Sequence, residues 1–409
     1  MTPEEAMAVA DRLARPDAPH LPSNEAWWAQ SLAHGAPGIA LLHIELAAAG
    51  LRPWRRAQDW LSVAAASPIT SGSGTALFYG APAVAYALAA TAAVRPAAYR
   101  SALEALDTQI AVDAHRRVMA ANARIHAGLL PELAEFDAIR GLAGIGAYLL
   151  WRDPGGSAVR AVLDYLVRLV DPLSADGIPV PGWWTDTGPT GRPDDEFPGG
   201  HGNAGMAHGI SGPLALLALA ARQEITVPGQ LDAIASICAW LDSWRIETEA
   251  GSRWPYMITR EELAVRATHP HHSGARRRPS WCYGTAGLAR AQQLAALVSG
   301  DSERSRIAEE ALVGALTDPA QLSATTDGSL CHGFAGLARI TARASADATE
   351  PIAAQLRALI PGLLAAMGRP TDRESPGLLE GAAGTALAAL APAGEPTPSS
   401  TWDTCLLIT

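Results

Sequence analysis

The stretch HGISGPLALLALA, from His208 to Ala220, opens with Gly-x-x-Gly and continues as an apolar run typical of a buried helix. Six further copies of this phrase are HGAPGIALLHIELA at His34, YGAPAVAYALA at Tyr79, RGLAGIGAYLL at Arg140, YGTAGLARAQQLA at Tyr283, HGFAGLARITARA at His332 and EGAAGTALAALA at Glu380. A single Gly-x-x-Gly is ordinary helix punctuation, but seven copies along one chain indicate a repeat architecture. The copy at Tyr79 departs from the pattern, because Ala83 replaces the second glycine.

Each phrase is expected to open a helix. Glycine permits a tight approach or a positive φ just before a helix, and the second glycine would let the helix start pack against a neighbour. A second amphipathic stretch lies between phrases, for example residues 305–316 and 350–367. Because a helix pair cannot bury its own apolar face, the pairs must stack. The sequence therefore predicts an all-α protein of seven helix-pair repeats, stacked as an open solenoid or closed into a ring.

Composition excludes several classes of protein. The 409 residues are 48% hydrophobic and only 6% aromatic, which favours a helical core over disorder or a β-sandwich. The chain has no lysine and a formal charge of −10, so it lacks a P-loop or Schiff-base lysine and is not expected to bind nucleic acid. The uncharged stretch 61–94 is interrupted by Pro82, so we expect a buried helix pair there and no transmembrane segment.

Two long intervals between phrases are rich in loop-forming residues. They cover residues 176–206 and 247–280, and each runs directly into a phrase with a chemically reactive side chain. We expect them to be substrate-handling loops at a cavity mouth, with solvent-exposed connections as the alternative.

The fifth and sixth phrases carry the residues of a possible metal site. They read Trp281-Cys282-Tyr283-Gly284 and Cys331-His332-Gly333, so both cysteines stand two positions before a leading glycine. Two thiolates and an imidazole suit Zn²⁺, and three protein ligands leave one position open, as in catalytic zinc sites. The alternative is that these are buried core cysteines, which is our expectation for Cys238. Cys405 lies near the C-terminus, has no motif and is expected to take no part in the site.

Other polar residues near the phrases are candidates for acid–base or electrostatic roles. His208 immediately precedes a helix and is suited to proton transfer near neutral pH. Asp137 could orient His208 or simply cap a helix, and one of the arginines 276–278 could steady an anion or lie in a solvated loop. Three further histidines are assigned to a loop: His269, His271 and His272.

The sequence resembles the lanthionine synthetase C-like family. The most specific matches are WCYG from Trp281, CHG from Cys331, AHGISG from Ala207 and the Trp254-Pro255 pair, and the closing STWDTCLLIT is also similar. The resemblance extends over essentially the whole chain and implies an α/α toroid, a double-layered helical barrel forming a single domain over residues 1–409. It further implies a free-standing lanthipeptide cyclase.

The resemblance also assigns roles to individual residues and to partners. One Zn²⁺ per chain would be held by Cys282, Cys331 and His332, with His208 as the acid/base, Asp137 and Arg278 as supporting polar residues and Tyr283 beside the zinc. A cysteine thiol of a dehydrated precursor peptide would add to dehydroalanine or dehydrobutyrine and form a thioether ring. His208, or a zinc-bound water as the alternative, would protonate the enolate. The resemblance further implies a leader on the precursor, a separate dehydratase and an export transporter as partners. It also implies a cytoplasmic location, with membrane association through a biosynthetic complex.

Three other functions share some of these features. A relative in the family could add glutathione to dehydrated residues or act as a peptide-binding scaffold. A prenyltransferase also uses zinc to activate a thiol on a helical toroid, although its repeats differ from these. A carbohydrate-active α/α barrel would need paired carboxylates, and the repeat phrases supply only Glu45 and Glu380.

Overall fold

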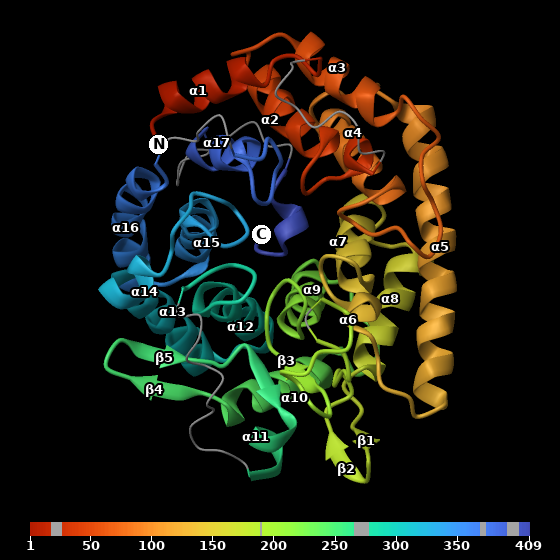
Figure 1. Ribbon diagram of the computed structural model, residues 1–409, viewed down its shortest axis with the longest axis vertical. Coiled ribbons are helices and arrows are strands. Elements are labelled where there is room, and N and C mark those ends of the chain that lie inside the picture. Colours follow the sequence, from red (N-terminus) through yellow and green to blue (C-terminus); the bar gives the residue numbers. More distant parts are fainter. Residues whose placement is uncertain (18–26, 189, 266–277, 369–373, 391–400) are drawn as a thin grey trace. The chain divides into compact units, whose positions relative to one another are not determined.

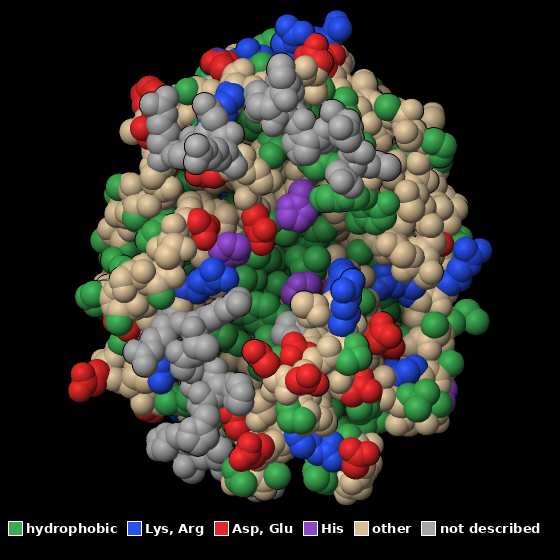
Figure 2. Space-filling model, in the orientation of Figure 1, with side chains coloured by type: hydrophobic (Ala, Val, Ile, Leu, Met, Phe, Trp, Pro, Cys, Tyr) green, Lys and Arg blue, Asp and Glu red, His purple; other side chains and the backbone are tan. Residues whose placement is uncertain are grey.

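The computed structural model describes residues 1–17, 27–188, 190–265, 278–368, 374–390 and 401–409. The chain forms two compact units. Unit 1 contains Met1–Asp113 and Thr325–Cys405, and unit 2 contains Ala114–Ala324 and Leu406–Thr409. No helix among the described residues is long and apolar enough to cross a membrane. On the face drawn in Figure 2, arginine and acidic side chains are interspersed across the surface.

All seven repeat phrases open a helix, as the repeat pattern predicts (Figure 1). These helices are α2 (Ala36–Ala48), α4 (Ala81–Val94), α7 (Leu142–Arg152), α9 (Ser211–Arg222), α12 (Thr285–Ser299), α15 (Phe334–Asp347) and α17 (Ala382–Leu390). They are buried around most of their circumference; in α9, for example, every residue from Ser211 to Ala220 is buried. A helix that is apolar on all sides needs cover on all sides, so these helices form the inner layer of each unit.

Amphipathic helices cover the inner ones. They are α3 (Trp54–Ala64) on α2, α8 (Ser157–Arg168) on α7, α10 (Gln230–Ser243) on α9, α13 (Ser302–Thr317) on α12, α16 (Ile352–Ala366) on α15 and α1 (Pro3–Arg12) on α17. The last inner helix therefore takes its partner from the other end of the chain (Figure 1). The remaining helical elements are η1 (Trp28–Gln30), α5 (Arg100–His126), α6 (Leu133–Phe136), α11 (Arg260–Val265), α14 (Pro319–Ser323) and η3 (Thr404–Leu406).

The described strands of unit 2 lie within the two long intervals or at their edges, in three antiparallel pairs. These are β1 (Leu173–Ala175) with β2 (Ile178–Val180), β3 (His201–Asn203) with β6 (Met257–Thr259), and β4 (Ile246–Thr248) with β5 (Gly251–Arg253). The pairing of β3 with β6 joins one interval to the other, with His201 opposite Thr259. The intervals are therefore partly ordered by pairing with each other.

The turn before each helix explains both glycines of the phrase. A Cβ on Gly333 would lie 2.2 Å from the backbone nitrogen of Ser329, and a Cβ on Gly336 would lie 2.1 Å from the carbonyl oxygen of Leu330. The nearest obstacle at the second glycine is the carbonyl of its own turn, but the expected packing against a neighbour is also present, since a Cβ on Gly38 would lie 2.8 Å from Leu378 Cβ. Only Gly80 among the leading glycines has a positive φ, +75°, and its repeat is the one with Ala83.

Backbone hydrogen bonds join the turns of successive repeats. In unit 1, Leu32 N donates to Phe78 O at 3.0 Å, Leu378 N to Ala33 O at 2.8 Å and Cys331 N to Leu379 O at 2.9 Å. The first and seventh repeats are thus neighbours. In unit 2, the same kind of bond links Met206 N to Cys282 O at 3.0 Å, and Ala138 N to Ala207 O at 3.1 Å.

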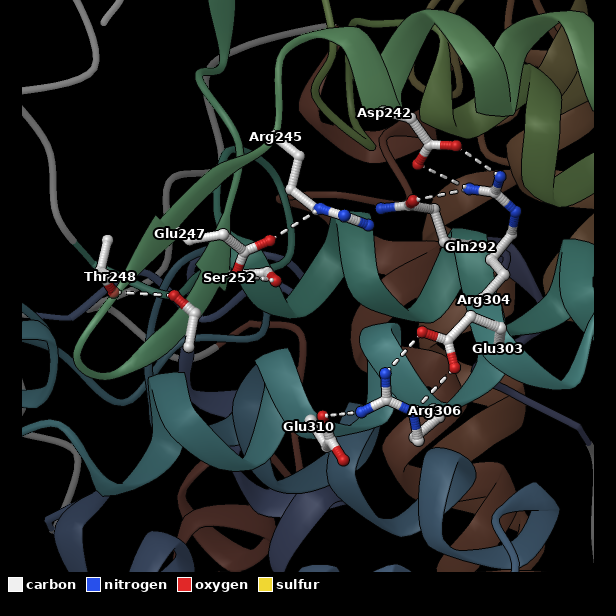
Figure 3. Close-up of polar contacts among 11 residues, drawn as sticks. Asp242, Arg245, Glu247, Thr248, Ser252, Gln292, Glu303, Arg304, Arg306 and Glu310 are labelled. Carbon is white, nitrogen blue, oxygen red and sulfur yellow. Dashed lines mark hydrogen bonds and ion pairs between the residues drawn. The ribbon is translucent and has the colours of Figure 1, made fainter.

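Ion pairs fix helices of unit 2 to one another (Figure 3). Arg304 at the start of α13 makes a bidentate pair with Asp242 on α10, with N–O distances of 2.6 and 3.0 Å. The same guanidinium donates to Gln292 on α12 at 3.3 Å. One side chain therefore bridges three helices of this unit.

The C-terminal residues are tied to both units. In unit 1, the fully buried Asp403 pairs with Arg339 at 2.6 Å and Arg343 at 2.7 Å. Burial alone would raise the pKa of Asp403, but the two guanidinium groups outweigh it and hold the pKa at about 2. In unit 2, Leu406 O accepts a hydrogen bond from Trp281 Nε1 at 2.9 Å.

We expect Gly336→Ala to destabilise the protein by about 1–3 kcal/mol, because the new methyl group meets backbone that cannot move aside. The control is Gly362→Ala in α16, where a Cβ meets nothing within 4 Å. Alanine should stabilise that helix position by about 0.5–1 kcal/mol. Urea unfolding measures both effects, and equal stability of the two variants would contradict the account of the turn.

Asp403→Asn should cost about 2–3 kcal/mol at neutral pH, the equivalent of a pKa lowered by about two units, because it leaves two arginines facing a neutral group in the interior. The pKa of Asp403 is lowered on folding, from 3.8 to about 2, so its stabilisation is complete above the unfolded value. That stabilisation is lost as the pH falls through the folded value. Unfolding free energies measured between pH 7 and pH 2 should therefore converge for wild type and variant at low pH; a constant gap would refute the ion-pair explanation.

Candidate functional site

Cys282 lies in the tight turn that precedes α12. Its side chain is buried, and its Sγ is 3.7 Å from Ser280 Oγ. Ser280 Oγ also accepts a hydrogen bond from Tyr283 N at 3.3 Å, while Cys282 O accepts from the turn before α9. The backbone on both sides of the thiol is therefore fixed.

Cys331 and His332 occupy the equivalent turn before α15. Ser329 holds the place of Ser280, four residues before the leading glycine, and its Oγ accepts from His332 N at 3.3 Å. Cys331 and His332 are partly exposed. The two cysteines stand at the same distance from a leading glycine in the sequence, and in the structure they occupy equivalent positions in two similar turns.

Three side chains in the described part of the chain could hold a metal ion as a group: Cys282, Cys331 and His332. One ligand atom from each lies within 4.8 Å of the other two. Two sulfurs and one imidazole nitrogen form a donor set that fits Zn²⁺, so the sequence-predicted ligands suit the metal that they were expected to bind.

His208 and Asp137 form a hydrogen-bonded pair within unit 2. His208 Nδ1 is 2.7 Å from Asp137 Oδ2, and the aspartate is fully buried while the imidazole is partly exposed. The other carboxylate oxygen, Oδ1, accepts from Arg140 N at 2.5 Å and Gly141 N at 2.8 Å. Asp137 therefore both caps its turn and orients His208, which were the two alternatives that the sequence left open.

Tyr283 lies next to this pair. Its ring centroid is 6.2 Å from that of His208, and its hydroxyl accepts a hydrogen bond from Asn203 Nδ2 at 3.2 Å. Asn203 is fully buried, with its Oδ1 accepting from Gly205 N. Sequence reasoning missed Asn203, although the Asn-Ala-Gly that precedes the AHGISG match was a usable signal.

Tyr256 is a second residue that the sequence did not single out. Its ring centroid is 6.4 Å from that of Tyr283, and its hydroxyl donates to Arg278 O at 3.2 Å. Burial raises the pKa of Tyr256 to about 12, with the neighbouring Cys282 acting in the same direction. It stays protonated at neutral pH and is a donor. The Trp254-Pro255 match directly before it was the available signal.

Arg278 makes no hydrogen bond or ion pair with His208 or Asp137 in the described part of the chain. Its Nε is buried and, among the described residues, has no hydrogen-bond partner. Its catalytic role stays a prediction. Arg276, Arg277, His269, His271 and His272 lie outside the described residues.

The other two cysteines are in the interior. Burial raises the pKa of Cys238 to about 11 and that of Cys405 well above its usual range. Both thiols remain protonated at neutral pH and are unsuited to bind metal or attack a substrate. No disulfide joins any of the four cysteines, all of which lie in the described residues.

Residues 26–407 match the family model described as "Lanthionine synthetase C-like protein". The chain belongs to this family. Among solved structures, the lanthionine synthetase C-like chain is similar to one titled "Nisin cyclase", with a TM-score of 0.79 and 19% identity over 94% of each chain. That likeness confirms the predicted α/α toroid fold.

A second solved structure is an inactive variant of an α-1,6-mannanase from Salegentibacter in complex with α-1,6-mannotriose. It aligns over 100% of this chain and 99% of its own, with 11% identity, but its TM-score of 0.44 is too low to support an argument. A search of curated proteins gives no match.

Proposed function

We propose that this protein is a zinc-dependent lanthipeptide cyclase, which closes thioether rings in a dehydrated precursor peptide. The observation that carries the proposal is the group formed by Cys282, Cys331 and His332, whose ligand atoms lie within 4.8 Å of one another in a member of this family. A pure scaffold would have no need of two thiols and an imidazole in this arrangement.

Because the three side chains fit zinc, the chemistry that the metal would supply can be stated. A zinc ion held by Cys282, Cys331 and His332 would lower the pKa of a cysteine thiol of the peptide, so that thiolate is present at neutral pH. The two cysteinates would also supply electron density that favours nucleophilic attack over tight retention of the thiolate.

His208 is the group that we assign to proton transfer. Because Asp137 occupies Nδ1, the neutral imidazole carries its hydrogen there, and Nε2 is left to accept or donate a proton. The Asp137 carboxylate also stabilises the imidazolium when His208 is protonated. His208 is partly exposed, as a group that must meet a substrate should be.

Proton transfer completes the addition. The carbon–sulfur bond forms at the β-carbon of the dehydrated residue, and the electron pair of its double bond moves toward the carbonyl as an enolate. His208, protonated at Nε2 by the proton that the thiol has released, then delivers it to the α-carbon, which gives lanthionine or methyllanthionine. The guanidinium of Arg278 would stabilise the enolate charge. Tyr283, anchored by Asn203, would limit the space beside the imidazole.

The substrate and partners follow from the proposed chemistry. The peptide must already contain dehydrated serine or threonine, so a separate dehydratase has to act first. A leader on the precursor, an export transporter and a cytoplasmic location belong to the same proposal, as does the single cyclase domain with loops 176–206 and 247–280 at the cavity mouth.

Replacement of a proposed ligand should remove the metal. Cys282→Ala and Cys331→Ala should each lose zinc and ring closure, because two remaining ligands hold zinc poorly. Cys238→Ala, the matched control, removes an inert buried thiol and should keep both. Metal analysis after gentle purification measures the first effect. Full zinc content in either ligand variant would rule out the assigned site.

His208→Ala should keep zinc and slow ring closure by about 10²–10⁴-fold, the usual contribution of general acid–base catalysis. His34→Ala is the control, because His34 stands in the same His-Gly phrase but is not assigned to the reaction. Ring closure leaves the peptide mass unchanged, so alkylation of remaining thiols must be counted. Equal activity of the two variants would remove His208 from the mechanism.

The same assay, with glutathione present, tests the alternative activity. If the peptide gains the mass of glutathione while its own thiols can still be alkylated, the activity is intermolecular addition and the proposed ring closure is wrong. Protected thiols without a mass change support the proposal.

A further inference from the structure

The imidazole of His332 lies between two carboxylates of unit 1. Its Nε2 is 3.3 Å from Asp327 Oδ2, and its Nδ1 is 3.7 Å from Glu380 Oε1. The first contact is an ion pair slightly longer than an ordinary N–H···O hydrogen bond of 2.7–3.2 Å, and the second is clearly longer. The two ring nitrogens therefore have different environments.

Asp327 is held firmly at the start of the α15 turn. Its Oδ1 accepts a hydrogen bond from Ser329 N at 2.8 Å, and its backbone carbonyl accepts from Phe334 N at 3.1 Å. The carboxylate packs against the Cα of Gly333, where a Cβ would lie 2.4 Å from Oδ1. Because Oδ1 is hydrogen-bonded to the backbone, the other carboxylate oxygen, Oδ2, faces His332.

Neither carboxylate belongs to the candidate metal group. Among the described residues, only Cys282, Cys331 and His332 supply ligand atoms that all lie within 4.8 Å of one another. Asp327 therefore contacts the proposed ligand without being a ligand itself. In metal sites, a histidine ligand commonly donates its second ring N–H to a carboxylate, which fixes the tautomer and the orientation of the ring.

We propose that Asp327 is the positioning residue of His332. It accepts the hydrogen of Nε2, which leaves the lone pair of Nδ1 for the metal. The inference rests on the proposed zinc site and extends it to a residue in no repeat phrase. Glu380, half-exposed and beyond hydrogen-bond distance, has no such role.

Asp327→Asn tests the inference with little change in shape. The amide oxygen can keep the hydrogen bond from Ser329 N, and the amide NH₂ then faces Nε2. Because an NH₂ group only donates, it favours the tautomer with hydrogen on Nδ1, the nitrogen that the metal needs. Zinc affinity should fall by about 10–100-fold, measured by competition with a chromophoric chelator.

Glu380→Gln is the matched control, since it also removes one negative charge beside His332. It should leave the zinc affinity unchanged. Equal weakening in both variants would show a general effect of charge and would overturn the proposal. Thermal unfolding of the metal-free proteins shows whether either variant fails to fold; in that case Asp327→Glu, which keeps a carboxylate acceptor, should restore affinity relative to Asp327→Asn.

The tautomer itself can be observed. Long-range ¹H–¹⁵N spectra of the metal-free protein, with the His332 signals identified by their loss in His332→Gln, should show hydrogen on Nε2 in wild type and on Nδ1 in Asp327→Asn. If wild type binds no zinc, the proposed function fails. If wild type binds zinc and Asp327→Asn binds it equally well, only the role of Asp327 fails.

Discussion

The structure depends on the tight turn before each inner helix, which has no room for a side chain at the leading glycine. In the repeat of Cys282, a Cβ on Gly284 would lie 2.0 Å from Ser280 N, and a Cβ on Gly287 would lie 2.1 Å from Trp281 O. In this turn the chain can fold back so closely only because both positions are glycine; the repeat with Ala83 differs, since its Gly80 has a φ of +75°. Because the turn is compact, its backbone can also hydrogen-bond to the turn of the next repeat, as Met206 N does with Cys282 O.

The turn is similar in each repeat, so side chains that differ between repeats occupy equivalent positions. The residue four positions before the leading glycine accepts a hydrogen bond from the backbone: Ser280 Oγ from Tyr283 N, and Asp137 Oδ1 from Arg140 N. A serine only completes the turn. An aspartate at this place has a second oxygen, and in the third repeat that oxygen binds His208. The same place in a shared turn thus carries a simple cap in one repeat and, in another, a cap that also binds the histidine that we propose for proton transfer.

The sequence predicted best those features that depend on residues close together in the chain. Gly-x-x-Gly and the apolar run after it predicted all seven inner helices, and the shared offset of Cys282 and Cys331 predicted equivalent turns. The pairing of α1 with α17 was missed, because packing between chain ends leaves no local pattern.

The contacts around the site were predicted less completely for the same reason. Asn203 and Tyr256 reach Tyr283 from β3 and from the residue before β6, and only the pairing of those two strands fixes their places. Asp327 looked like an ordinary loop aspartate, since nothing in the order of residues shows that its free oxygen faces His332. The long intervals also looked like plain loops, although β-pairing orders part of them.

The central claim is that two cysteines and one histidine of this chain bind one catalytic zinc. X-ray absorption spectroscopy of the purified protein at the zinc edge tests it most directly. The account predicts about one zinc per chain, with two sulfur neighbours at about 2.3 Å, one imidazole nitrogen at about 2.0–2.1 Å and one light exchangeable ligand. Absence of zinc, or a shell of oxygen and nitrogen without sulfur, would contradict it.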